Sequence, residues 1–278
     1  LAPSDHTILY VGTGEANGSA DSFAGVGIYR IDNADTTATL VGPINPVRTY
    51  QDASNITQNV PAFNGRSISR ILVHPTNPGL LFVGTAGGVI GMGGDGPLGG
   101  TVPPLGMRGL YRLSGANGAP ASVSVLKLTV STAAAAGGFD TPSTGNRNVN
   151  DMMFPDPANP DVLVVWMNGT TAVNDGGVFR STNATGAAPT FTQAFATTTS
   201  SARAMFAGYK QATAPNQVLY VATGESATGT ACGSATQSGA LRVSTDGGAT
   251  WLEEGPVDAG ALSGYTETGF LSLGPQLV

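Results

Sequence analysis

Lysine occurs at only two positions of the 278-residue sequence, 127 and 210, and charged residues of all kinds make up 11%. Few residues therefore suit the exposed faces of helices, and 40 glycines and 18 prolines would interrupt them. The net charge is −6, whereas binding to nucleic acid or to an anionic membrane surface requires a basic patch. These shortages favour an all-β protein and exclude nucleic acid from its expected partners.

Residues that bind metals or form covalent links are also scarce. Cys232 is the only cysteine, which excludes an intrachain disulfide and a cysteine-rich zinc site. The two histidines, His6 and His74, are too far apart in sequence to form a ligand pair. We therefore expect no metal centre and no cofactor, although carboxylates in the loops could bind calcium. No apolar run reaches the 18 to 20 residues of a membrane span, so we expect no membrane insertion.

A short repeat is the main signal in the sequence. The pattern glycine, aliphatic residue, large apolar residue, arginine occurs at residues 27–30, 109–112, 177–180 and 239–242. An apolar, β-rich run precedes each copy, at residues 8–13, 80–85, 162–167 and 218–223. Two of these runs follow Asn-Pro turns at residues 74–78 and 156–160, which in turn follow another apolar stretch.

One repeat unit thus predicts a four-stranded antiparallel meander, which is the blade of a β-propeller. Four blades are visible, at about residues 5–45, 66–130, 149–196 and 202–254, and the first lacks its inner strand. The remaining residues, 255–278, would either close the ring onto the first blade or begin another blade. We favour the second alternative, in which residues 1–278 form a single domain or fragment of a propeller with six to eight blades.

The most specific motif lies in the last blade, where residues 244–251 read Ser-Thr-Asp-Gly-Gly-Ala-Thr-Trp. The pattern predicts a turn in which Asp246 accepts backbone N–H bonds and Gly248 adopts positive φ. Trp251 would pack the turn against the blade, and Ser244 begins the motif. Weaker copies follow the other Gly-x-x-Arg phrases, at residues 32–35, 114–118 and 181–186.

This motif resembles the Asp box, or BNR repeat, and the chain is similar to secreted bacterial propellers of the sialidase-like, sortilin-type and xyloglucanase-like group. The phrases at residues 10–15, 74–78 and 177–182 add to the resemblance. It implies a propeller fold over about nine-tenths of the chain, and an Asp box that lies away from any active site. It does not select one function, because the group contains hydrolases, sorting receptors and assembly factors.

Candidate binding residues fall into two groups. Arg70, Asp151 and Arg203 lie early in the inner strands and could meet at the mouth of the central channel, with Arg66 and Arg147 on the loops that lead into these strands. An inter-blade salt bridge of Asp151 with its neighbours is the alternative that we favour. The second group lies in loops between the second and third strands and consists of Glu15, Asp21 and Glu225. Anchoring of these loops is the favoured role for Glu15 and Glu225, ahead of ligand or calcium contact and of catalysis.

Three functions are compatible with these features. The first is a secreted or cell-surface module, or a periplasmic one, that binds a protein or a glycan without catalysing a reaction. The second is a glycoside hydrolase or lyase of the Asp-box propeller type, whose catalytic residues would be acidic side chains at the channel mouth or would lie in blades beyond these residues. The third is a structural component of an extracellular filament or coat. We expect no catalytic residue in the first and third cases, and the oligomeric state stays open.

Overall fold

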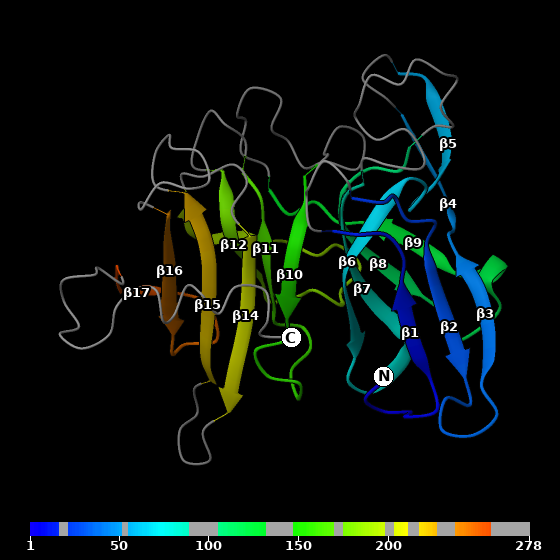
Figure 1. The fold of residues 1–278 in the computed structure, drawn as a ribbon, viewed down its shortest axis with the longest axis horizontal. Helices are drawn as coiled ribbons and strands as arrows, with labels where there is room; N and C mark the ends of the chain where they lie inside the picture. The colour runs from blue at the N-terminus through cyan, green and yellow to red at the C-terminus, as the bar shows by residue number, and fades with distance from the viewer. Residues whose placement is uncertain are drawn as a thin grey trace.

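The chain folds into antiparallel β-sheets, as Figure 1 shows for the computed structural model, and the prediction of an all-β protein is confirmed. The structure describes residues 1–16, 22–51, 55–88, 105–131, 147–169, 175–197, 203–210, 217–226 and 237–256. Within these ranges, helical structure is limited to one 3-10 turn, η1 (Pro120–Ser122). No helix in this part of the chain is long and apolar enough to cross a membrane.

The described residues form five sheets, and in each of them the strands follow one another in chain order. The first sheet contains β1 (Leu9–Gly12), β2 (Ile28–Asp32) and β3 (Thr39–Ile44). The second contains β6 (Arg66–His74), β7 (Asn77–Gly87), β8 (Gly109–Ser114) and β9 (Ser124–Lys127). The third contains β10 (Val149–Met153), β11 (Leu163–Met167), β12 (Gly176–Ser181) and β13 (Thr192–Thr197). The fourth contains β14 (Arg203–Lys210), β15 (Gln217–Ser226), β16 (Gln237–Ser244) and β17 (Leu252–Pro256).

The first sheet has three strands, and these correspond to the second, third and fourth strands of the other large sheets. Leu9 pairs with Ile31 in the first sheet as Leu81 pairs with Leu113 in the second. The described residues of the first sheet contain no counterpart of β6, β10 and β14, which agrees with the missing inner strand expected from the sequence.

The fifth sheet is a hairpin that the sequence analysis did not predict. It consists of β4 (Val47–Gln51) and β5 (Thr57–Pro61) and lies between the first and second sheets in the chain. The Arg48 guanidinium carbon lies 5.3 Å from the centre of the Tyr50 ring and 5.6 Å from that of Tyr111 on β8. These cation-π contacts connect the hairpin to the second sheet.

The four large sheets stand next to one another in chain order (Figure 1), as the blades of a propeller would. Consecutive sheets make contact through β1 and β6, through β6 and β10, and through β10 and β14. No comparable contact joins β14 to β1 within the described ranges, so no ring closure is seen.

Three apolar cores fill the spaces between consecutive sheets. Tyr10 and Ile28 of the first sheet pack with Val83 and Tyr111 of the second. Equivalent clusters join the second sheet to the third, around Phe82 and Val165, and the third to the fourth. Each interior sheet therefore buries both of its faces, which explains why its strands carry continuous apolar runs rather than an alternating pattern.

Candidate functional site

The inner strands β6 and β10 carry the two charged candidates at equivalent positions. In β6 the register shifts between Ile68 and Arg70, and in β10 it shifts between Val149 and Asp151. A β-bulge of this kind inserts one residue and turns the next side chain to a new direction. Arg70 and Asp151 therefore directly follow equivalent bulges and point toward the following sheet, and the structure brings them together.

Asp151 connects three sheets. Its Oδ1 atom lies 3.1 Å from Nε of Arg70 on β6 and accepts the backbone N–H of Met152 at 2.9 Å. Its Oδ2 atom accepts the backbone N–H of Phe206 on β14 at 2.7 Å. Both carboxylate oxygens are thus used by neighbouring strands, in the inter-sheet salt bridge that the sequence analysis favoured.

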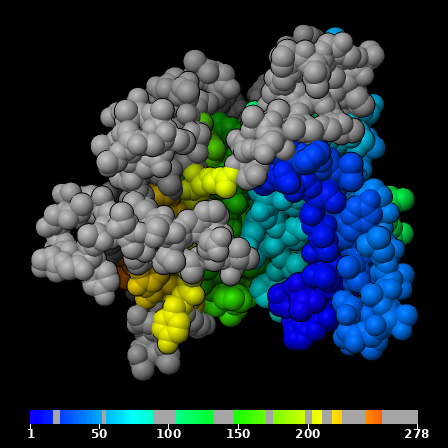
Figure 2. Space-filling model, in the orientation of Figure 1, coloured from blue at the N-terminus to red at the C-terminus, as the bar shows by residue number. Residues whose placement is uncertain are grey.

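The pair is asymmetric in its exposure to solvent. The Asp151 side chain is 8% exposed, whereas that of Arg70 is 49% exposed. Burial raises the pKa of Asp151 above its ordinary value, although the N–H groups of Phe206 and Met152 and the charge of Arg70 act in the opposite direction. In the space-filling view, the atoms of β6 and β10 lie between the first sheet in blue and β14 in yellow (Figure 2).

Arg203 does not occupy the position expected from the sequence. It pairs with Gly224 at the beginning of β14, whereas Met205 pairs with Ala222. Counted by strand register, Met205 is the residue equivalent to Arg70 and Asp151, because β14 has no bulge. Met205 is 60% exposed, and Arg203 is also exposed to solvent. The three charged residues thus do not form one cluster.

The two arginines at the start of the inner strands are buried, and Arg66 is the first residue of β6 rather than part of a loop, whereas Arg147 precedes β10. Nε of Arg66 donates a hydrogen bond to the carbonyl of Gly106, just before β8. Nη2 of Arg147 lies 2.6 Å from Oδ2 of Asp175, just before β12, and Nη1 donates to the Asp175 carbonyl at 2.8 Å. Both arginines bind the segment that leads into the third strand of their own sheet. Their hydrogen bonds therefore fix the position of these loops.

Of the loop carboxylates, only the side chain of Glu15 is described. Its Oε2 atom accepts the backbone N–H of Phe23 at 3.3 Å, and its own N–H donates to the Phe23 carbonyl at 2.9 Å. These bonds close the loop between β1 and β2, in agreement with an anchoring role. Asp21 and the side chain of Glu225 lie outside the described residues. Within the described part of the chain, no group of three potential metal ligands is present.

The turn after β16 has the hydrogen bonds that its sequence suggested. Oδ1 of Asp246 accepts the backbone N–H groups of Ala249 at 2.9 Å and Thr250 at 3.0 Å, and Oδ2 accepts the Thr250 hydroxyl at 2.6 Å. Ser244 Oγ accepts the N–H of Gly248, whose φ is +83°. A Cβ atom on Gly248 would lie 2.5 Å from Val164 Cγ1 of the third sheet, so only glycine fits there. Trp251 packs into the core between the third and fourth sheets.

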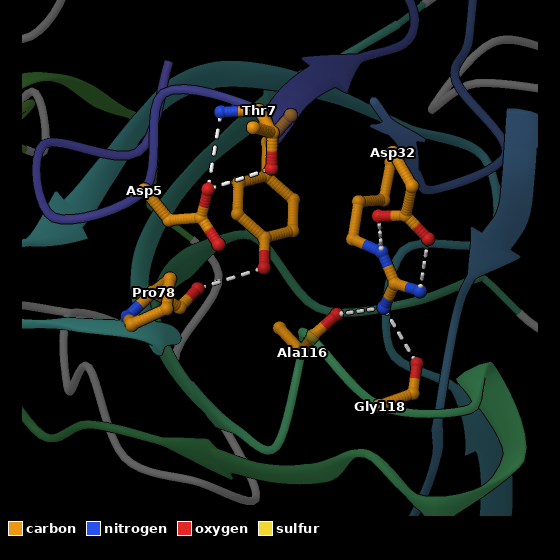
Figure 3. Close-up of polar contacts among 8 residues, drawn as sticks. Asp5, Thr7, Asp32, Pro78, Ala116 and Gly118 are labelled. Atoms are coloured by element: carbon orange, nitrogen blue, oxygen red, sulfur yellow. Dashed lines mark hydrogen bonds and ion pairs between the residues drawn. The ribbon is translucent and has the colours of Figure 1, made fainter. Parts of the chain in front are cut away.

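The arginines of the sequence repeat, which lie on the third strands, connect consecutive sheets. Nη1 of Arg30 donates to the carbonyls of Ala116 at 2.7 Å and Gly118 at 2.6 Å, in the turn after β8 (Figure 3). Nη1 of Arg112 donates to the carbonyls of Ala184 at 2.9 Å and Gly186 at 2.6 Å, in the turn after β12. Nε of Arg180 donates to the carbonyl of Gly247 at 2.9 Å, in the turn after β16. We call this contact the arginine latch.

Arg242 does not belong to this series, although the sequence repeat placed it there. In the third sheet, Leu163 pairs with Ser181 and the adjacent Val164 pairs with Arg180. In the fourth sheet, Leu219 pairs with Ser244 and the adjacent Tyr220 pairs with Val243. Val243 therefore occupies the latch position, and Arg242 lies one residue earlier on the opposite face of the sheet. The Arg242 guanidinium carbon lies 4.1 Å from the centre of the Phe195 ring in the third sheet.

Comparison with known proteins gives limited information. No family model matches the chain, and no curated protein matches it. A structural match is a crystal structure of an ancestral GH74 enzyme, with 12% sequence identity and a TM-score of 0.31. The match covers 98% of this chain and 44% of that enzyme, so the chain spans less than half of its length.

Proposed function

We propose that the four large sheets are blades of a β-propeller that contains more than these four, in the range of six to eight. The meander order within each sheet supports this proposal, as do the apolar cores between consecutive sheets. The turn of residues 244–251 fits an Asp box that connects the last two strands of a blade.

We further infer that this propeller is a secreted or cell-surface module that binds a protein or glycan without catalysis. The observation that carries this inference is that the charged residues at and before the inner strands bind other parts of the protein. Asp151 accepts bonds from strands of two sheets besides its own contact with Met152, and the Arg147–Asp175 pair is buried. Both oxygens of such a carboxylate are held by donors of the scaffold, which favours a structural role over transfer of a proton to a substrate.

The loop between β1 and β2 is the described part of the molecule that best suits ligand contact. Its residues Phe23 and Val26 are 55% and 40% exposed, next to the bonds that Glu15 makes to the loop backbone. An exposed aromatic ring on an anchored loop can stack on a sugar or insert into a protein surface with little loss of entropy.

A glycan and protein-binding screen on the intact protein, combined with an assay for glycoside cleavage, tests this proposal. We expect binding without product release, and we expect Phe23→Ala to weaken it at least about tenfold, which corresponds to about 1.4 kcal/mol. Leu126→Ala is the matched control, because Leu126 is an exposed apolar residue on the outer strand β9. Cleavage of a glycoside that is lost in Asp151→Asn would contradict the proposal and support the hydrolase alternative.

The same measurements address the third alternative. A filament or coat component would show concentration-dependent polymers and no saturable ligand binding, and Phe23→Ala would then leave the polymers unchanged. Sedimentation of the intact protein over a range of concentrations distinguishes the two cases.

A further inference from the structure

The turn after β2 in the first sheet has the same backbone structure as the turns that receive the arginine latch. Ala34 donates its N–H to the carbonyl of Thr7 at 2.8 Å, as Ala116 does to Gly79 and Ala184 does to Asp161, both at 2.9 Å. Thr36 donates to Asn33 at 3.0 Å, as the glycines at positions 118 and 186 donate to residues 115 and 183. By position, the carbonyls of Ala34 and Thr36 thus correspond to the acceptors of Arg30 and Arg112.

These two carbonyls receive no arginine. In the described residues, no side chain donates to either of them. Ala34 is also partly exposed, whereas the equivalent Ala116 and Ala184 are fully buried. The turn therefore has the backbone structure that accepts an arginine latch in the other sheets, and no described arginine donates to it.

The face of the first sheet next to this turn has the composition of a buried interface. Val11 is 41% exposed, while the equivalent Val83, Val165 and Val221 are 0% exposed because the preceding sheet covers each of them. Further apolar residues share this face with Val11 by strand register, and each is partly or fully exposed: Leu9, Tyr29, Ile31 and Leu40. We call these five residues the open face.

The fourth sheet cannot supply the latch, whether it belongs to this molecule or to a second copy. The latch position of the fourth sheet is occupied by Val243, which has no hydrogen-bond donor in its side chain. Residues 257–278 contain neither arginine nor lysine. All ten arginines of the sequence lie within the described ranges, and the three on third strands at the latch position already bind the second, third and fourth sheets.

We propose that the open face docks a further antiparallel β-sheet, formed by polypeptide outside residues 1–278, that carries an arginine at the latch position of its third strand. The apolar residues of the open face bury the partner sheet's side chains, and its guanidinium donates to the carbonyls of Ala34 and Thr36. The proposal rests on the proposed propeller with further blades, whereas it is independent of the proposed ligand binding, because the open face is separate from the loop of Phe23.

The test uses the protein itself as the probe. A donor chain carries Val243→Arg, which creates the missing latch, and Val11→Glu, which prevents it from receiving a partner. We expect this donor to bind the unmodified chain at least about tenfold more tightly than a control donor with Val243→Gln and Val11→Glu, measured by analytical ultracentrifugation. Circular dichroism and thermal unfolding establish that both donors are folded.

Equal binding of the two donors would overturn the proposal, as would binding that persists when the receiving chain also carries Val11→Glu. Self-association of the unmodified chain that Val11→Glu abolishes would identify a second copy as the occupant and would also overturn it.

A second measurement does not depend on the folding of the donors. A photoreactive benzoylphenylalanine replaces Val11 in the protein as its source organism produces it, and the cross-linked peptides are sequenced. We expect peptides from outside residues 1–278 that contain an arginine. Cross-links confined to residues 1–278 would overturn the proposal.

Discussion

Arg112 and Ala184 are 72 residues apart in the sequence, and they are joined by a 2.9 Å hydrogen bond from Nη1 of the arginine to the carbonyl oxygen of the alanine. The same nitrogen also donates to Gly186 at 2.6 Å, so one guanidinium fixes the turn of the neighbouring sheet at two points. Hydrogen bonds that involve a charged donor contribute more to stability than those between neutral groups.

Replacement of Arg112 by alanine should therefore lower the free energy of unfolding by about 2 to 3 kcal/mol, because the carbonyls of the buried Ala184 and the partly buried Gly186 lose their donor. Chemical denaturation with urea measures this change. Arg203→Ala provides the control, since Arg203 is exposed, and should change the free energy of unfolding by less than about 0.5 kcal/mol. Equal effects of the two substitutions would show that the latch does not stabilise the contact between sheets.

The carboxyl group of Asp151 should make stability depend on pH. Its folded-state pKa is raised by burial, so the folded protein binds this proton more tightly than the unfolded chain does. The stabilisation from protonation is fully present below the unfolded pKa of about 3.9 and is lost as the pH rises through the folded pKa. The stability advantage of the wild type over Asp151→Asn should thus shrink between pH 4 and neutral pH, as measured by urea unfolding at several pH values. A difference that grows with pH would contradict the raised pKa.

Asp246 should show the opposite dependence. Burial acts to raise its pKa, but hydrogen bonds from Thr250, Ser244 and Ala249 outweigh burial and lower it. The stabilisation that the ionised Asp246 carboxylate provides is present above about pH 3.9 and is lost as the pH falls through the lowered folded pKa. Asp246→Ala should therefore cost about 1 kcal/mol at pH 7 and less at pH 2. Asp35→Ala, which removes an exposed carboxylate from the turn of the first sheet, serves as the comparison.

Tyr10 gives a spectroscopic test of the contact between the first and second sheets. Burial raises the pKa of Tyr10 to about 12, with the charge of Arg30 acting to lower it. Its hydroxyl donates a 2.7 Å hydrogen bond to the carbonyl of Pro78 in the second sheet. The difference in ultraviolet absorbance between wild type and Tyr10→Phe should show one phenol that ionises near pH 12. Stability from this group is present below about pH 10 and is lost as the pH rises through 12. Ionisation near pH 10 would show that Tyr10 is exposed to water.

Much of the strand order could be predicted because apolar runs and turn residues are local signals. The run of residues 80–85 lies in β7, and the predicted turn of residues 244–251 has the bonds that Asp246 was expected to accept. The hairpin β4–β5 was missed, since its strands Val-Arg-Thr-Tyr-Gln and Thr-Gln-Asn-Val-Pro contain few apolar residues and its contact with Tyr111 is not local.

The errors at the candidate site have one physical origin, which is strand register. A bulge in β6 and in β10, and its absence in β14, decide that Met205 rather than Arg203 corresponds to Arg70. A shift of one residue also moves Arg242 to the face opposite to that of Arg180. A sequence repeat aligns residue positions. The face of a sheet on which a residue lies depends on the pairing between strands, and the repeat alone does not determine this pairing.

The arginine latch also sets a direction for biosynthesis. Arg30 leaves the ribosome 86 residues before Ala116, and the acceptors of Arg112 and Arg180 likewise lie in the sheet that is translated next. The latch nitrogen of each sheet consequently finds its acceptors only when the following sheet has been translated, and folding during translation advances from the amino-terminal end. A ribosome that stalls within a later sheet would leave the preceding one with unsatisfied guanidinium N–H donors and an exposed apolar face, the form in which chaperones and proteases recognise an unfinished protein.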